Sequence, residues 1–205
     1  QRYKTTIEYK GTNFVGWQKQ TSGLSVQEVI EKSIHSFSGE LSQVYAAGRT
    51  DSGVHALGQV CHFDLNKEFD EREIQGALNY YVKPNAISIL NVEKVDEQFH
   101  ARFSAKFRSY IYKIINRKAP LAIMHNLAWQ VAETLDTEHM HKVAQVLIGT
   151  NDLTSFRSTH CQAKNPIRTI DTIEVKKVNY EEINIFIKAP SFLHNQVRII
   201  TGCLY

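Results

Sequence analysis

The chain has 205 residues, 42% of them hydrophobic and 22% charged, and a formal net charge of +3. This length suits one large or two small domains whose cores bury about 70% of the unfolded surface. No apolar run is long enough to span a membrane and no signal-peptide pattern opens the chain, so we expect a cytoplasmic protein without a membrane partner. Three scattered cysteines exclude a disulfide framework, and no CxxC or HExxH spacing indicates a metal site.

The first half of the chain predicts strand, helix, strand, strand, helix and strand, in that order. The first helix begins at Ser25, where Ser-Val-Gln-Glu has the form of a capping box, and ends at Gly39. Asp70 opens the second helix with the similar run Asp-Glu-Arg-Glu. Apolar residues recur at helical spacing in both helices, at Val26, Val29, Ile30, Ile34 and Phe37 and at Ile74, Ala77, Leu78 and Tyr81. The strands are expected over residues 2–9, 44–47, 58–65 and 86–95.

The second half predicts a similar mixture of strands and helices. The expected elements are strands over 106–115, 167–178 and 183–189 and helices over 136–148 and 193–204, with a linker containing Pro120 after the first strand. On the last helix, Arg198 is expected one turn after His194, away from the apolar stripe. Two such halves predict an α+β fold in which two related units, over residues 1–100 and 101–205, share one sheet.

Positive charge is concentrated in particular parts of the sequence. The chain has no acidic residue between Gln98 and Glu133, and a second acid-free span covers residues 153–170. The first span contains Arg102, Lys106, Arg108, Lys113, Arg117 and Lys118, and the second contains Arg157, Lys164 and Arg168. Aromatic residues alternate with the first group, and such rings stack on bases or pack beneath basic side chains. These basic residues are therefore candidate phosphate contacts, and the alternative is a sheet with one solvated basic face.

The turn over residues 48–56, Gly-Arg-Thr-Asp-Ser-Gly-Val-His-Ala, concentrates chemistry between two predicted strands. It places the carboxylate of Asp51 near Arg49 and His55, and its glycines permit backbone angles that other residues resist. The simpler alternative is that Asp51 only hydrogen-bonds within its own turn, as an Asp before Ser-Gly commonly does.

Three motifs in this order resemble the signatures of the TruA family of tRNA pseudouridine synthases. The first is the turn over residues 48–56, the second is Phe-His-Ala-Arg-Phe-Ser-Ala over 99–105 with Tyr-Ile-Tyr over 110–112, and the third is Phe-Leu-His-Asn-Gln-Val-Arg over 192–198 with Gly202. Residues 9–18 are similar to the family's opening run, so the resemblance covers nearly the whole chain. The family continues for another helix and strand, and we therefore expect a further segment after Tyr205.

The resemblance implies a fold and an activity. The fold is two ferredoxin-like or RRM-like units that form a mainly antiparallel sheet around a central cleft. The activity is the isomerisation of uridine to pseudouridine at positions 38, 39 and 40 in the anticodon arm of tRNA. It also implies a homodimer that binds tRNA and needs no cofactor. Recognition is expected to depend on tRNA shape and phosphates more than on base edges.

The resemblance also assigns roles to individual residues. Asp51 becomes the catalytic carboxylate, which either attacks ribose C1′ or removes a proton from C2′. Arg198 is its cationic partner, since a guanidinium keeps its charge where desolvation favours a neutral acid. Arg49 fills the space of the flipped nucleotide or supports it, and Tyr110 stacks on the uracil. His55 is expected to support the turn.

Two other classes of protein share parts of this pattern. Asp-Ser-Gly is also the tripeptide of aspartic proteases, but those use two carboxylates that share a proton, which Arg49 would disrupt. A non-catalytic RNA-binding module also combines α+β units with basic, aromatic strands. A pure RNA binder has no need of the Asp51 carboxylate, which repels phosphate, so the turn favours the enzyme.

Overall fold

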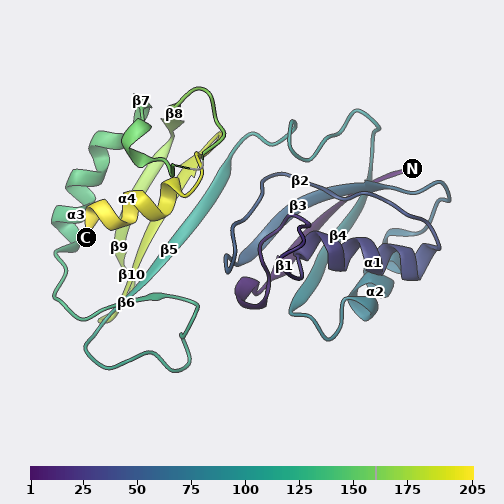
Figure 1. Cartoon of the computed structure of the whole chain (residues 1–205), viewed down its shortest axis with the longest axis horizontal. Coiled ribbons are helices and arrows are strands. Elements are labelled where there is room, and N and C mark those ends of the chain that lie inside the picture. The colour runs from purple at the N-terminus through teal and green to yellow at the C-terminus, as the bar shows by residue number, and fades with distance from the viewer. Residues whose placement is uncertain (160) are drawn as a thin grey trace. The chain divides into compact units, whose positions relative to one another are not determined.

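The computed structural model describes residues 1–159 and 161–205 and divides into two compact units, Gln1–Ala105 and Lys106–Tyr205. Each unit has its own hydrophobic core and its own four-stranded sheet (Figure 1). The α+β class predicted from the sequence is confirmed. The single sheet expected to run through both units stays a prediction.

The first unit follows the predicted order of elements. Its elements are β1 (Arg2–Tyr9), the 3-10 helix η1 (Gly11–Asn13), α1 (Val26–Ser38), β2 (Tyr45–Ala46), β3 (Ala56–Asp64), α2 (Glu71–Tyr81) and β4 (Ile87–Val95). The sheet has the order β2-β3-β1-β4, and all its strand pairs are antiparallel. Since β1 is central and alternates buried with less buried residues, one face of the sheet lies in the core against α1 and α2.

Both helices of the first unit begin at the capping residues that the sequence predicts. The N–H of Glu28 donates to the Ser25 hydroxyl at 3.2 Å, and Gly39 ends α1 in the left-handed region at φ 75°. Asp70 caps α2 by accepting from the N–H of Arg72 at 2.9 Å. The expected capping box would place this bond one residue later, so that detail of the prediction is wrong.

The second unit contains more elements than predicted. They are β5 (Arg108–Asn116), β6 (Trp129–Val131), α3 (Thr137–Ala144), η2 (Gln145–Leu147), β7 (Gly149–Asp152), η3 (Thr154–Phe156), β8 (Ile167–Ile170), β9 (Thr172–Lys177), β10 (Glu182–Ala189) and α4 (Gln196–Leu204). The main sheet has the order β6-β5-β10-β9, in which only the short β5–β6 pair is parallel among the described strands. A separate pair, β7–β8, makes a small second sheet.

Three predictions for the second unit are corrected. The single strand over 167–178 is two strands that break at Asp171, because β8 pairs with β7 and β9 pairs with β10. The helix over 136–148 is α-helical only to Ala144 and continues as a 3-10 turn. The last helix begins at Gln196 rather than at residue 193, since Asn195 lies in the left-handed region at φ 59° and interrupts the spiral.

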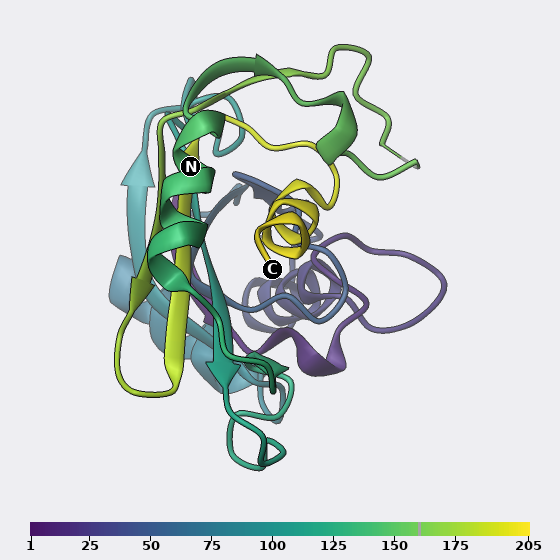
Figure 2. The same ribbon diagram turned by 90° about the vertical axis from the view of Figure 1, so that its left-hand side faces the viewer.

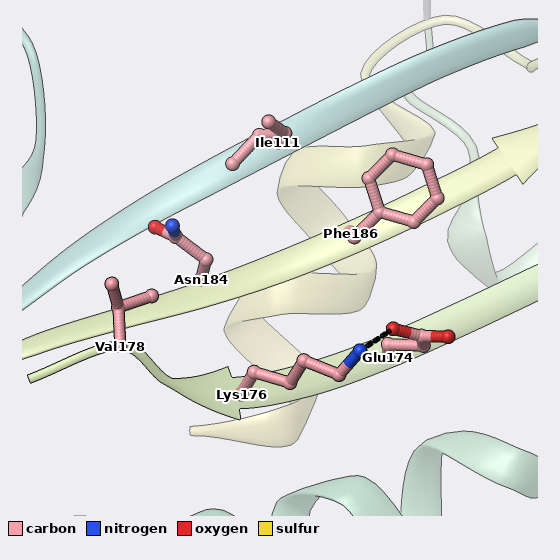
Figure 3. A pocket seen from close by; sticks show the side chains of 6 residues that line it. All are labelled: Ile111, Glu174, Lys176, Val178, Asn184 and Phe186. Carbon is pink, nitrogen blue, oxygen red and sulfur yellow. Dashed lines mark ion pairs between the residues drawn. The ribbon is translucent and has the colours of Figure 1, made fainter.

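The main sheet of the second unit has a covered and an open face. Ile183, Ile185 and Ile187 of β10 are buried in the core beneath α3 and α4, and two views of the molecule show these helices against the strands (Figures 1 and 2). The open face has a shallow hollow of about 370 Å³, lined by Ile111, Glu174, Lys176, Val178, Asn184 and Phe186 (Figure 3). An ion pair between Lys176 and Glu174 crosses its edge.

Candidate active site

The Asp51 turn connects β2 to β3 in the first unit. The two strands pair directly, with Ala46 opposite Cys61, and the Gln59 amide donates to the Gly48 carbonyl at 2.6 Å across the base of the turn. Within the turn, the N–H of Val54 donates to the Asp51 carbonyl at 3.2 Å. Asp51 itself is half-buried, so it lies on a turn with a hydrogen-bonded backbone and is still partly open to solvent.

A loop over residues 11–17 lies against this turn. The N–H of Trp17 donates to the Thr50 carbonyl at 3.0 Å, and the N–H of Gly53 donates to the Phe14 carbonyl at 3.4 Å. The Ser52 hydroxyl donates to the same Phe14 carbonyl at 3.3 Å. The sequence places this loop only as the opening run of the family resemblance. The structure shows that this loop packs against the turn that carries Asp51 and is hydrogen-bonded to it.

Two glycines allow this close approach. A Cβ at Gly11 would lie 1.9 Å from the Val54 carbonyl oxygen, and one at Gly16 would lie 2.7 Å from the Thr50 carbonyl oxygen. Gly16 also has φ +117°, a conformation that side chains with a Cβ rarely adopt. Only glycine at these two positions lets the loop contact the backbone both before and after Asp51.

Two side chains connect the turn to the rest of the unit. The hydroxyls of Tyr9 and Thr50 are 2.8 Å apart, and the N–H of Gly11 donates to Nδ1 of His55 at 2.9 Å. This second bond requires Nδ1 of His55 to be an acceptor. His55 therefore supports the turn, as the sequence predicts, and Tyr9 is a contact that sequence reasoning missed.

Arg49 lies next to Thr50 and has an exposed side chain. It is available to a ligand from solvent, while its neighbour Asp51 is half-buried. The turn thus carries a half-buried aspartate on a hydrogen-bonded backbone and, two residues earlier, an exposed arginine. A carboxylate held in this way can act as a nucleophile or as a general base.

Tyr110 and Arg198 lie in the second unit. Tyr110 is on β5 opposite Ile187, so it is on the helix-covered face of the sheet, and its ring meets that of Phe192 edge-on at 5.1 Å. Arg198 is on α4 and is exposed, while Ile200 on the same helix is buried. The expected spacing of Arg198 one helical turn after His194 is wrong, because His194 precedes the helix. The pairing of Arg198 with Asp51 stays a prediction.

The predicted phosphate contacts differ in what they already touch. Lys106 is exposed, and Arg102 is exposed with its guanidinium 5.8 Å from the Phe103 ring centroid. Arg108 donates to the Pro190 carbonyl at 2.5 Å. Arg117 pairs with Glu181 at 3.0 Å and also donates to the carbonyls of residues 119 and 120. Its guanidinium holds its own loop together, and its role in binding phosphate stays a prediction.

Over residues 1–159 and 161–205, no three or more His, Cys, Asp or Glu side chains are grouped so that they could hold a metal ion. No helix within these ranges is long and apolar enough to cross a membrane.

Comparison with known proteins identifies the family. The sequence model described as "tRNA pseudouridine synthase" matches residues 6–104 and 143–205, which include Asp51 and Arg198. A protein of Ehrlichia chaffeensis named tRNA pseudouridine synthase A is 55% identical over 204 residues, which cover 99% of this chain and 83% of that protein. A protein of the same name from Wolbachia pipientis wMel is 56% identical over 99% of this chain and 83% of its own length. Another from Parvibaculum lavamentivorans is 49% identical over 99% of this chain and 82% of its own length. The chain therefore belongs to the TruA family of tRNA pseudouridine synthases.

Proposed function

We propose that the chain converts uridine to pseudouridine at positions 38, 39 and 40 in the anticodon arm of tRNA, with Asp51 as its catalytic carboxylate. The observation that carries this proposal is the placement of Asp51 on a turn whose backbone is held on both sides by the loop over residues 11–17. Such bracing suits a group that must meet one atom of a substrate, and family membership supports the reaction.

The reaction breaks the bond between ribose C1′ and uracil N1, turns the base and joins C1′ to C5. A proton leaves C5 and N1 gains one, so the product is an isomer of the substrate. The enzyme must keep the detached base and exclude water, which would react with the sugar. Asp51 either attacks C1′, forming a bond that is broken when C5 rejoins, or removes a proton from C2′ as the base leaves and returns it to C2′ when C5 joins C1′. Both routes require an ionised carboxylate beside the sugar.

Three further residues are proposed to assist. Arg198 provides the positive charge that keeps Asp51 ionised where solvent is excluded. Arg49 supports the flipped nucleotide or fills its place in the stack. Tyr110 stacks on the uracil, and its contact with Phe192 holds the ring in one orientation. In this proposal the catalytic turn belongs to a domain over about residues 1–100, and the second domain, from residue 101 onward, supplies Tyr110 and Arg198.

Binding of the tRNA is proposed to use phosphate contacts from Arg102, Lys106, Arg108 and Arg117. Lys106 is the clearest candidate, because it is exposed while Arg108 and Arg117 already donate to groups in their own unit. We also propose that the protein acts in the cytoplasm as a homodimer, one subunit holding the tRNA body while the other presents its site. These two points rest on the family resemblance.

The decisive experiment is the substitution Asp51→Asn. Asparagine keeps the size of the side chain and its turn-forming hydrogen bonds but removes the only nucleophile or base proposed beside the sugar. We expect pseudouridine formation to fall by more than about a thousandfold, while folding and tRNA affinity stay close to those of the parent protein. Single-turnover assays at saturating enzyme separate chemistry from binding. If Asp51→Asn kept a tenth of the parent rate, Asp51 would not be the catalyst.

A further inference from the structure

Tyr9 contacts both ends of the turn that carries Asp51. It is the last residue of β1 and is only 2% exposed. Its backbone lies opposite Ala56, where the turn enters β3, after an irregularity in the pairing of β1 with β3. Its hydroxyl is 2.8 Å from Oγ1 of Thr50, the residue directly before Asp51. The side chain of Tyr9 thus contacts the first part of the turn, and the backbone of Tyr9 pairs with the end of the turn.

Thr50 is fixed through its main chain as well as its side chain. Its carbonyl accepts the N–H of Trp17 at 3.0 Å, in the place that the missing Cβ of Gly16 leaves open. The Trp17 ring is buried, and its centroid is 6.3 Å from that of Tyr9. The position of Thr50 is therefore set by a buried aromatic pair, and Asp51 is the next residue along the chain.

We propose that Tyr9 is a positioning residue for Asp51, acting through the hydroxyl of Thr50. Its hydroxyl holds Thr50 so that the Asp51 carboxylate meets the ribose in a reactive geometry. The inference rests on the proposed function, since it needs Asp51 to be the catalyst. Its physical basis is that a displacement of a catalytic group by about 1 Å can lower a rate on the order of a hundredfold.

The chain offers a matched control on the same strand. Tyr3 is also buried on β1, and its hydroxyl donates to the Phe69 carbonyl at 3.0 Å and accepts from the Phe69 N–H at 2.8 Å. Those bonds fasten the segment ahead of α2 and do not touch the turn. Tyr9→Phe and Tyr3→Phe each remove one buried hydroxyl from β1, so a general loss of stability affects both variants.

The experiment compares these two variants in single-turnover assays with the tRNA anticodon stem-loop. We expect Tyr9→Phe to slow the conversion of bound RNA by about tenfold to a hundredfold without changing the dissociation constant. Tyr3→Phe should keep the parent rate. Thr50→Val should be as slow as Tyr9→Phe, and Thr50→Ser should keep most of the rate because it keeps the hydroxyl. The double variant Tyr9→Phe/Thr50→Val should be no slower than either single variant, since both remove the same contact.

The possible results separate the two proposals. If the parent protein forms no pseudouridine, the proposed function fails and the positioning role fails with it. If the parent is active and Tyr9→Phe keeps more than half of its rate, only the positioning role is overturned. Equal slowing by Tyr3→Phe would also overturn it, because the effect would then be a general loosening of the unit. Should Tyr9→Phe fail to fold, the comparison of Thr50→Val with Thr50→Ser decides the question.

Discussion

Burial lowers the pKa of the His62 imidazole to about 4, because a charged ring in the core of the first unit loses its hydration. Nearby Arg2 and His100 act in the same direction, and Asp64 opposes them. The His62 ring stacks on that of Tyr45 with the ring centroids 5.1 Å apart. Its Nδ1 accepts a hydrogen bond from the N–H of Ala101 at 3.2 Å. The neutral ring therefore ties the Phe-His-Ala-Arg-Phe motif to the sheet.

This lowered pKa predicts a specific dependence of stability on pH. Between pH 6.5 and 4 the unfolded chain binds a proton at His62 that the folded chain excludes. The free energy of unfolding should thus be undiminished above pH 6.5 and fall by about 1.4 kcal/mol per pH unit toward pH 4. His62→Gln should remove this component, and His35→Gln, at an exposed site on α1, should retain it. Urea unfolding at pH 7 and pH 5 measures how far the free energy of unfolding falls between the two pH values. An equal fall in the parent and in His62→Gln would contradict the assignment.

At the scale of elements, we expect a glycine-to-alanine substitution to have opposite effects on stability in the two helices of the first unit. Gly76 is inside α2, where an added Cβ would meet open space, so Gly76→Ala should stabilise the protein by about 1 kcal/mol. Gly39 also has open space, but it ends α1 at φ 75°. Gly39→Ala should cost about 1 kcal/mol, because alanine disfavours the left-handed region. Thermal unfolding of both variants tests the pair, and a change of the same sign in both would contradict the helix bounds.

Strand pairing brings acidic residues next to the acid-free span around β5. Lys113 pairs with Glu182 at 2.7 Å and Arg117 with Glu181 at 3.0 Å, because β10 begins beside the end of β5. The span lacks acids in sequence but acquires them in the fold. Earlier in the span, Arg102 and Lys106 are exposed to solvent.

At the scale of the whole molecule, recognition of tRNA should be chiefly electrostatic. Lys106→Ala is expected to weaken binding to all substrate tRNAs alike and to lower the slope of affinity against salt concentration by about one unit. The rate of conversion of bound tRNA should change little. Lys32→Ala is the control, since Lys32 is an exposed lysine that already pairs with Glu28 on α1. Binding titrations at several salt concentrations give the slope, and an unchanged slope in Lys106→Ala would show that this residue only faces solvent.

The proposed homodimer is the second expectation at this scale. It predicts a particle of twice the chain mass for the full-length protein at micromolar concentration. Light scattering measures this directly. A monomer alone under those conditions would contradict the proposal and would leave the assignment of Asp51 in place.

Local signals in the sequence were sufficient for most elements of the first unit. Ser25, Gly39 and Asp70 mark helix ends because their side chains or backbone angles act within one turn of chain. The Asp51 turn was also predicted, since its residues are contiguous. Short strands such as β6 and β7 were missed because three or four residues carry no periodicity, and their partners lie far away in sequence.

The sequence by itself determined the family, the α+β class, the candidate carboxylate Asp51 and the capped helices. Each of these depends on residue identity over short stretches. Only the tertiary structure decided that Tyr9 reaches Thr50, that two glycines admit a loop against the turn, and that Arg117 is engaged by Glu181. It also decided where residues 167–178 divide between two sheets. These contacts join residues tens of positions apart, and their geometry is set by strand register and close packing, which no local pattern records.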